Sequence, residues 1–167
     1  SWGDPFGAGD TMYDNIGDFF QTSTVFDNTV NISGGSKNGS FYLSAARMDQ
    51  EGIVPETGFQ KSTFRFNGDR THGNFTVGAN VAFSSAITDK TLTSSGLWGG
   101  GGNGAMAAVY GWSRNDDMKR YLNEDGTKYR MFEGLQELSS DLENPYWIVN
   151  KNKLRDKTNR FTGTTHA

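Results

Sequence analysis

The chain of 167 residues contains no cysteine, three prolines and two histidines. Without thiols it can form no disulfide, thiolate zinc site or iron–sulfur cluster, and it has no thiol nucleophile. One histidine is the penultimate residue, so a histidine-based metal site or catalytic triad has almost no residues to use. Neither sign of charge dominates, because 16 basic residues face 19 acidic ones and the net charge is −3. We therefore expect no cofactor and no nucleic-acid partner.

Long apolar runs are also missing. No stretch approaches the roughly 18 residues of a membrane helix, and no signal peptide opens the chain. The first residue is not Met, so we expect a fragment of a longer protein. Glycine is abundant at 22 residues, and aromatic residues make up 13% of the chain, with 12 phenylalanines. Many Phe and Gly with few Pro predict strands joined by tight turns.

Apolar residues alternate with polar ones from residue 26 to about residue 89. Turn-forming segments divide this region into four predicted strands, at 26–33, 40–49, 59–68 and 74–86. One face of these strands is apolar at thirteen of fourteen positions, and the opposite face is mostly polar. The fourteen positions are Phe26, Asn28, Val30, Ile32, Phe41, Leu43, Ala45, Phe64, Phe66, Phe75, Val77, Ala79, Val81 and Phe83.

Two all-β architectures produce this pattern. In a soluble sandwich the apolar face packs into a core, whereas in an outer-membrane barrel it contacts lipid. The turns at 34–39 and 69–73 are short, while the connection at 89–157 is long. Short turns at one end and long loops at the other are typical of a barrel. Periodicity alone does not separate the two.

The long connection carries the candidate contact residues. We expect a helix after Ser113, a second one over 132–138, and a flexible loop at the glycine run 99–104. Five aromatic side chains in this region can stack on sugar rings or anchor a partner protein, or they can form a local core that holds the loop together. They are Trp98, Tyr110, Trp112, Tyr146 and Trp147.

Several strings resemble one protein family and follow its order. The most specific are DQEGIVP at 49–55 and NPYW at 144–147. The chain thereby resembles the SusC/RagA family of TonB-linked outer-membrane transporters. The other strings are YDNIGDFF at 13–20, VNISGGS at 30–36, FYLS at 41–44, FRFN at 64–67, FTVGAN at 75–80 and NRF at 159–161.

The resemblance implies part of a 22-stranded transmembrane β-barrel in the bacterial outer membrane, an antiparallel meander with one long extracellular loop. Such proteins import oligosaccharides or peptides with a SusD-like surface lipoprotein, and they are driven by TonB through a region absent here. The expected parts are a leading loop at 1–25, four strands within 26–88, the extracellular loop at 89–157 and the start of a fifth strand at 158–167. No catalysis is expected. The rival hypothesis is a soluble β-sandwich module that binds glycans.

Four basic residues alternate just before the expected fifth strand. In an extended backbone they lie on one side, and that phase continues to Phe161, which should face lipid. At that level an outer membrane holds lipopolysaccharide phosphates, which suit Lys and Arg. A solvated run, or pairing with the acidic stretch 115–143, is the simpler alternative, and a bulge would turn the side chains inward. The four residues are Lys151, Lys153, Arg155 and Lys157.

Overall fold

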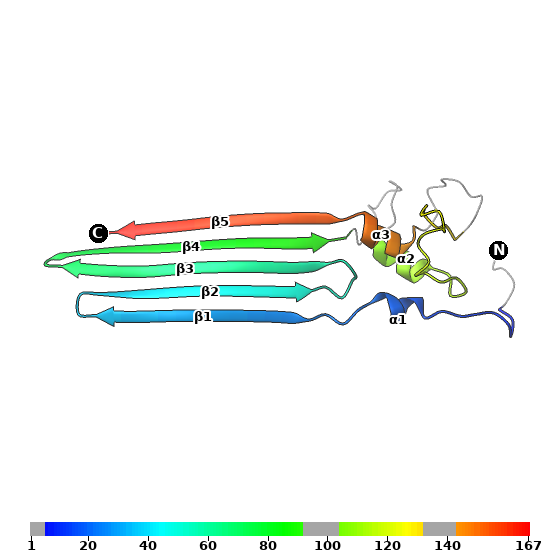
Figure 1. Cartoon of the computed structure of the whole chain (residues 1–167), viewed down its shortest axis with the longest axis horizontal. Coiled ribbons are helices and arrows are strands. Elements are labelled where there is room, and N and C mark those ends of the chain that lie inside the picture. Colours follow the sequence, from blue (N-terminus) through cyan, green and yellow to red (C-terminus); the bar gives the residue numbers. More distant parts are fainter. Residues whose placement is uncertain (1–5, 92–103, 132–142) are drawn as a thin grey trace. The chain divides into compact units, whose positions relative to one another are not determined.

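A computed structural model describes residues 6–91, 104–131 and 143–167 of the chain (Figure 1). The chain divides into two compact units, which we name the sheet unit and the loop unit. The sheet unit comprises Thr22–Gly52, Thr57–Lys90 and Arg155–Ala167. The loop unit comprises Ser1–Gln21, Ile53–Glu56 and Thr91–Leu154.

The strands form one five-stranded antiparallel meander in the order β1-β2-β3-β4-β5, which confirms the predicted all-β meander (Figure 1). Their bounds are β1 (Val25–Ser36), β2 (Gly39–Glu51), β3 (Gly58–His72), β4 (Phe75–Lys90) and β5 (Leu154–His166). β4 is the longest, with 16 residues, and β1 the shortest, with 12. β1, β2 and β3 extend beyond the predicted bounds at both ends, because the pairing continues through polar residues at the strand ends. β4 continues to Lys90, and β5 begins at Leu154 instead of near Asn159.

The register brings the alternating apolar residues of β1 to β4 onto one face. One row across the four strands consists of Ile32, Leu43, Phe66 and Val81, and the next row consists of Val30, Ala45, Phe64 and Phe83. This face is open, because Phe75 is 76% exposed and Phe26 is 66% exposed. Among the residues that the structure describes, no hydrophobic side chain of the sheet unit is buried.

The opposite face of the sheet is polar and bonded between strands. Tyr42 donates its hydroxyl hydrogen to Asn31 Oδ1 at 3.0 Å, and the Ser40 hydroxyl donates to the Asp69 carboxylate. These hydrogen bonds pair the polar side chains of neighbouring strands with each other. The two faces therefore suit different surroundings.

The loop unit contains three short helices: α1 (Asn15–Phe19), α2 (Ala105–Gly111) and α3 (Pro145–Lys151). The segment expected to be a leading loop thus includes a helix. The helix expected after Ser113 does not form, since the chain there makes turns, and the one expected over 132–138 lies outside the described residues. No helix in the described part of the chain is long and apolar enough to span a membrane.

Local sequence explains where α3 begins. Asn144 is the N-cap, and its side-chain Oδ1 accepts hydrogen bonds from the backbone N–H groups of Tyr146 at 2.8 Å and Trp147 at 3.3 Å. Pro145 occupies the first turn, where its missing N–H is not needed. The helix packs into a small core made by Phe19, Ala105, Ala108, Val109, Trp112, Met118, Ile148 and Val149.

Candidate functional site

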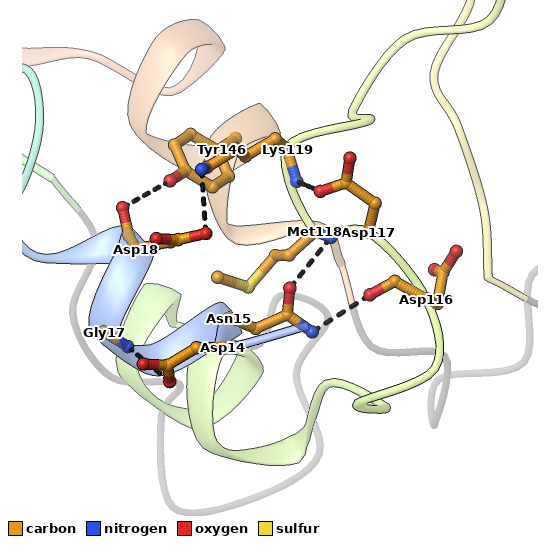
Figure 2. A network of polar contacts seen from close by, with 9 residues as sticks. All are labelled: Asp14, Asn15, Gly17, Asp18, Asp116, Asp117, Met118, Lys119 and Tyr146. Atoms are coloured by element: carbon orange, nitrogen blue, oxygen red, sulfur yellow. Dashed lines mark hydrogen bonds and ion pairs between the residues drawn. The ribbon is translucent and has the colours of Figure 1, made fainter. Parts of the chain in front are cut away.

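The loop unit is organised around the buried side chain of Asn15, the first residue of α1, which is 6% exposed (Figure 2). Its Nδ2 donates to the carbonyl oxygens of Ser113 and Asp116, each at 3.0 Å. Its Oδ1 accepts from the backbone N–H of Met118 at 3.2 Å. One amide side chain therefore satisfies three backbone groups of a segment about a hundred residues further along the chain.

A second buried asparagine holds the same segment from its other side. Asn144 is 1% exposed, and its Nδ2 donates to the carbonyl oxygen of Met118 at 2.8 Å. The backbone of Met118 is thus bonded by Asn15 at its N–H and by Asn144 at its carbonyl, while its side chain is fully buried in the core. Burying a polar group costs free energy unless the group is hydrogen-bonded, and the polar groups of Asn15, Met118 and Asn144 named here are hydrogen-bonded. We call Asn15, Met118 and Asn144 the asparagine clamp.

Exposed contacts of Asp18 lie near Asn15 and Met118 (Figure 2). The Lys119 ammonium pairs with the Asp18 carboxylate at 2.8 Å, and this hydrogen bond raises the pKa of Lys119. The Tyr146 hydroxyl donates to the carbonyl oxygen of Asp18 at 3.0 Å. Burial raises the pKa of Tyr146, so its hydroxyl stays protonated and able to donate at neutral pH. These contacts tie α1 to the 113–120 segment and to α3.

Aromatic rings fill the space beside the clamp. Phe19 packs edge-on against Tyr146, with ring centroids 5.2 Å apart, and against Phe20 at 5.4 Å. Tyr146 in turn stacks on Tyr121 at 6.5 Å. Edge-to-face and offset arrangements of this kind are the favoured aromatic geometries. The rings join α1, the 113–121 segment and α3 in one cluster.

The five aromatic residues predicted as contacts lie in different surroundings. Trp112 is 5% exposed and belongs to the core, as the local-core alternative expects. Tyr146 and Trp147 are half-buried, whereas Tyr110 is 67% exposed. Trp98 lies outside the described residues. Contact of these residues with a partner or substrate stays a prediction, and Tyr110 offers the most open ring of those described.

Trp147 has two cationic neighbours. The ammonium nitrogens of Lys128 and Lys151 lie 5.8 Å and 5.7 Å from its ring centroid. Lys128 also pairs with the carboxylate of Glu143. The ring is thus engaged within the loop unit by cation–π contacts.

The four basic residues do not form the single stripe predicted from an extended backbone. That prediction is wrong at Lys151, because the helix capped by Asn144 continues through this residue. Lys153 pairs with Glu56 at 2.6 Å. The two that do lie on β5 are Arg155 and Lys157.

The side chains of β5 alternate between the two faces of the sheet without interruption. Arg155 binds Asp89 through two hydrogen bonds, at 2.6 Å and 3.0 Å, and the ring of His166 covers Gly78, where any Cβ would clash. The step from 89 to 78 on β4 equals the step from 155 to 166 on β5, so these contacts require no bulge between them. Arg155 and Phe161 therefore lie on the same face as Asp89, which is the apolar face.

The asparagine clamp was not among the predicted site residues. Its signal was present, because Asn15 lies in the 13–20 string and Asn144 in the 144–147 string that carry the family resemblance. An asparagine followed by proline is also an N-cap pattern. The partner of both side chains, Met118, has no signal of this kind in the sequence.

No protein-family model matches the chain. The chain is 25% identical over 151 residues to TonB-dependent receptor P3 of Formosa agariphila, which covers 90% of the chain and 14% of the receptor. It is 33% identical over 106 residues to the probable endo-1,4-beta-xylanase B of Aspergillus clavatus, which covers 64% of the chain and 45% of that protein. The chain thus spans less than half the length of either relative.

Proposed function

We propose that the chain is a membrane-spanning segment of the β-barrel of a TonB-dependent outer-membrane transporter. The observation that carries the proposal is a single sheet whose apolar face is exposed in the part of the chain that the structure describes. Phe75, Phe161 and Val30 are 76%, 70% and 64% exposed on that face. The similarity to a TonB-dependent receptor over 90% of the chain supports the same function.

The dimensions of the sheet suit a membrane. Barrel strands cross the hydrocarbon layer with about 9 to 11 residues, and the strands of this sheet have 12 to 16. The apolar rows occupy the middle of the strands and the half next to the short turns. The lipid-facing surface would thus extend over several rows of side chains.

Two pairs of charged side chains, which we call the charged belt, lie on the apolar face at the end of the sheet opposite the short turns. Arg47 binds both carboxylate oxygens of Asp49, at 2.8 Å and 2.6 Å, and donates to the Ser62 hydroxyl at 3.0 Å. Arg155 and Asp89 form a second two-bond pair on this face. Bidentate pairing lowers the cost of placing these charges at a membrane interface. We propose that the belt marks the outer boundary of the hydrocarbon layer.

The finer proposal is a SusC/RagA-type transporter that imports oligosaccharides or peptides with a SusD-like lipoprotein. The supporting evidence is the set of strings in the sequence, two of which supply the asparagine clamp. Connections 52–57 and 91–153 would then face the cell exterior. The proposed role is passage of cargo without catalysis, and coupling to TonB would depend on a region absent here.

A soluble glycan-binding sandwich is the second candidate, because the chain is also similar to part of a xylanase. A sandwich requires a second sheet packed about 10 Å from the first. Across residues 6–91, 104–131 and 143–167 all five strands belong to one sheet. That observation favours the barrel.

Cell fractionation of the whole protein that contains this chain tests the proposal. We expect the protein in the outer-membrane fraction, and we expect a surface lipoprotein to co-purify after mild detergent extraction. Binding of oligosaccharides and of peptides to the purified complex would then identify the cargo class. Recovery in the soluble fraction, with binding to insoluble glycan, would support the sandwich module and contradict the transporter.

A further inference from the structure

Residues 13–20, which we call the strap, connect two very different parts of the chain. On their N-terminal side, residues 6–12 are exposed throughout. On their C-terminal side, the backbone N–H of Gln21 donates to Ile53 at 2.9 Å, and β1 starts at Val25. The strap itself is anchored to segments about a hundred residues further on, through Asn15 and Phe19.

The strap supplies essential parts of the loop-unit core. Phe19 is 1% exposed and joins the same buried cluster as Met118 and Ile148. Asn15 bonds three backbone groups of the 113–118 segment. If the strap leaves, the buried N–H of Met118 loses its protein partner and the cluster loses Phe19, its largest fully buried side chain.

None of the helices α1, α2 and α3 is stable by itself. α1 has five residues, and α2 and α3 have seven each, whereas isolated helices shorter than about 12 residues are marginal in water. Their order depends on the shared core and on the asparagine clamp. Segments that share one small core open together.

We propose that the strap is a removable cover: its undocking opens the 113–121 and 144–149 segments in one cooperative step and uncovers the ring of Tyr146. Docked, the strap covers this ring with Phe19 and accepts its hydroxyl hydrogen at the Asp18 carbonyl. The docked state is held by Asn15, by Phe19 and by the backbone N–H of Tyr13, which donates to the Arg114 carbonyl oxygen at 2.8 Å. The Asp18–Lys119 pair adds little, since it is exposed and screened.

The inference does not depend on the transport function, because it concerns the loop unit alone. The first test is hydrogen exchange on the whole protein in detergent or lipid, with Asn15→Leu as the variant. The matched control is Ile16→Ala, on the next residue of α1, whose side chain is 44% exposed. We expect Asn15→Leu to accelerate exchange of the Met118, Trp147 and Ile148 amides by a common factor of about tenfold or more.

Two results would overturn the proposal. If Met118 alone exchanges faster while Trp147 and Ile148 do not, the segments do not open together. If no amide responds, the strap does not control the loop unit. The control Ile16→Ala and the amides of β2 and β3 should keep their exchange rates.

Tyrosine nitration gives a second and independent readout. In Asn15→Leu, Tyr146 should react faster, whereas Tyr110, already 67% exposed, should react at an unchanged rate. An unchanged rate at Tyr146 would show that the strap does not cover it. If Asn15→Leu fails to assemble, Phe19→Leu retains all three Asn15 bonds and should give the same pattern of faster exchange and nitration with a smaller factor.

Discussion

The two units of the chain place their apolar residues in opposite ways. In the part of the chain that the structure describes, all the buried hydrophobic side chains lie in the loop unit, eight in number. The sheet unit instead exposes rows of phenylalanine, valine and isoleucine on one face. The loop unit carries its own core, whereas the described part of the sheet unit buries no hydrophobic side chain.

Two different kinds of sequence pattern therefore build the two units. Strict alternation builds a sheet with one face for an apolar medium. Isolated asparagines and aromatic residues build the small core of the loop unit. Substitutions in matched pairs can therefore test each unit separately.

The largest loss of assembled protein is expected from a charge on the apolar face. Phe66→Arg should prevent assembly in the membrane, because an arginine facing the middle of the hydrocarbon layer costs about 2–4 kcal/mol. The neighbouring substitution Asn67→Arg, on the polar face, should assemble normally. Heat-modifiable migration of the whole protein in gels measures assembly. Equal assembly of both variants would contradict the lipid-facing assignment.

Loss of a core aromatic side chain should cost a similar free energy, but it should destabilise the loop unit and not the sheet. Trp112→Ala removes a ring that is 5% exposed and should destabilise the loop unit by about 3–5 kcal/mol, while the sheet still assembles. Tyr110→Ala should leave both units folded. If Tyr110 anchors a partner or substrate, its loss weakens binding by about 2 kcal/mol, roughly thirtyfold. Limited proteolysis measures the stability of the loop unit in both variants, and a binding assay measures any loss of affinity in Tyr110→Ala.

A smaller effect is expected at the asparagine clamp. Asn144→Ala removes the cap of α3 and the bond to the Met118 carbonyl, which should destabilise the loop unit by about 1–3 kcal/mol. Asn152→Ala, at an exposed position after α3, is the control and should be nearly neutral. Proteolysis rates across a urea series measure both. A neutral Asn144→Ala would show that the clamp contributes no stability.

The smallest effect concerns the basic residues of β5. Replacing Arg155 and Lys157 by Gln should reduce the lipopolysaccharide retained on the purified whole protein, because both lie on the strand whose Phe161 shares the apolar face. The reduction should be modest, since Arg155 already pairs with Asp89. Lys151→Gln, on α3, is the control. Unchanged retention of lipopolysaccharide in the double variant would contradict the expected contact.

Sequence periodicity predicted the sheet well and the loop unit poorly. The phases chosen for the four strands coincide in the register, as the row containing Ile32 and Leu43 shows. The helices were missed because each is one or two turns long, too short for a 3.6-residue period to stand out. The clamp was missed because it joins Asn15 and Asn144 to Met118 across long separations, and no local pattern records such contacts.

The central claim, that the apolar face of the sheet contacts lipid, is tested most directly by spin labels along β3. The chain has no cysteine, so single cysteines can be placed in turn at residues 63 to 67. In the whole membrane-embedded protein, collision with oxygen should peak at Phe64 and Phe66, and collision with a water-soluble nickel reagent at Thr63, Arg65 and Asn67. Labels at 64 and 66 that reach neither reagent would reveal a covering layer and contradict the account.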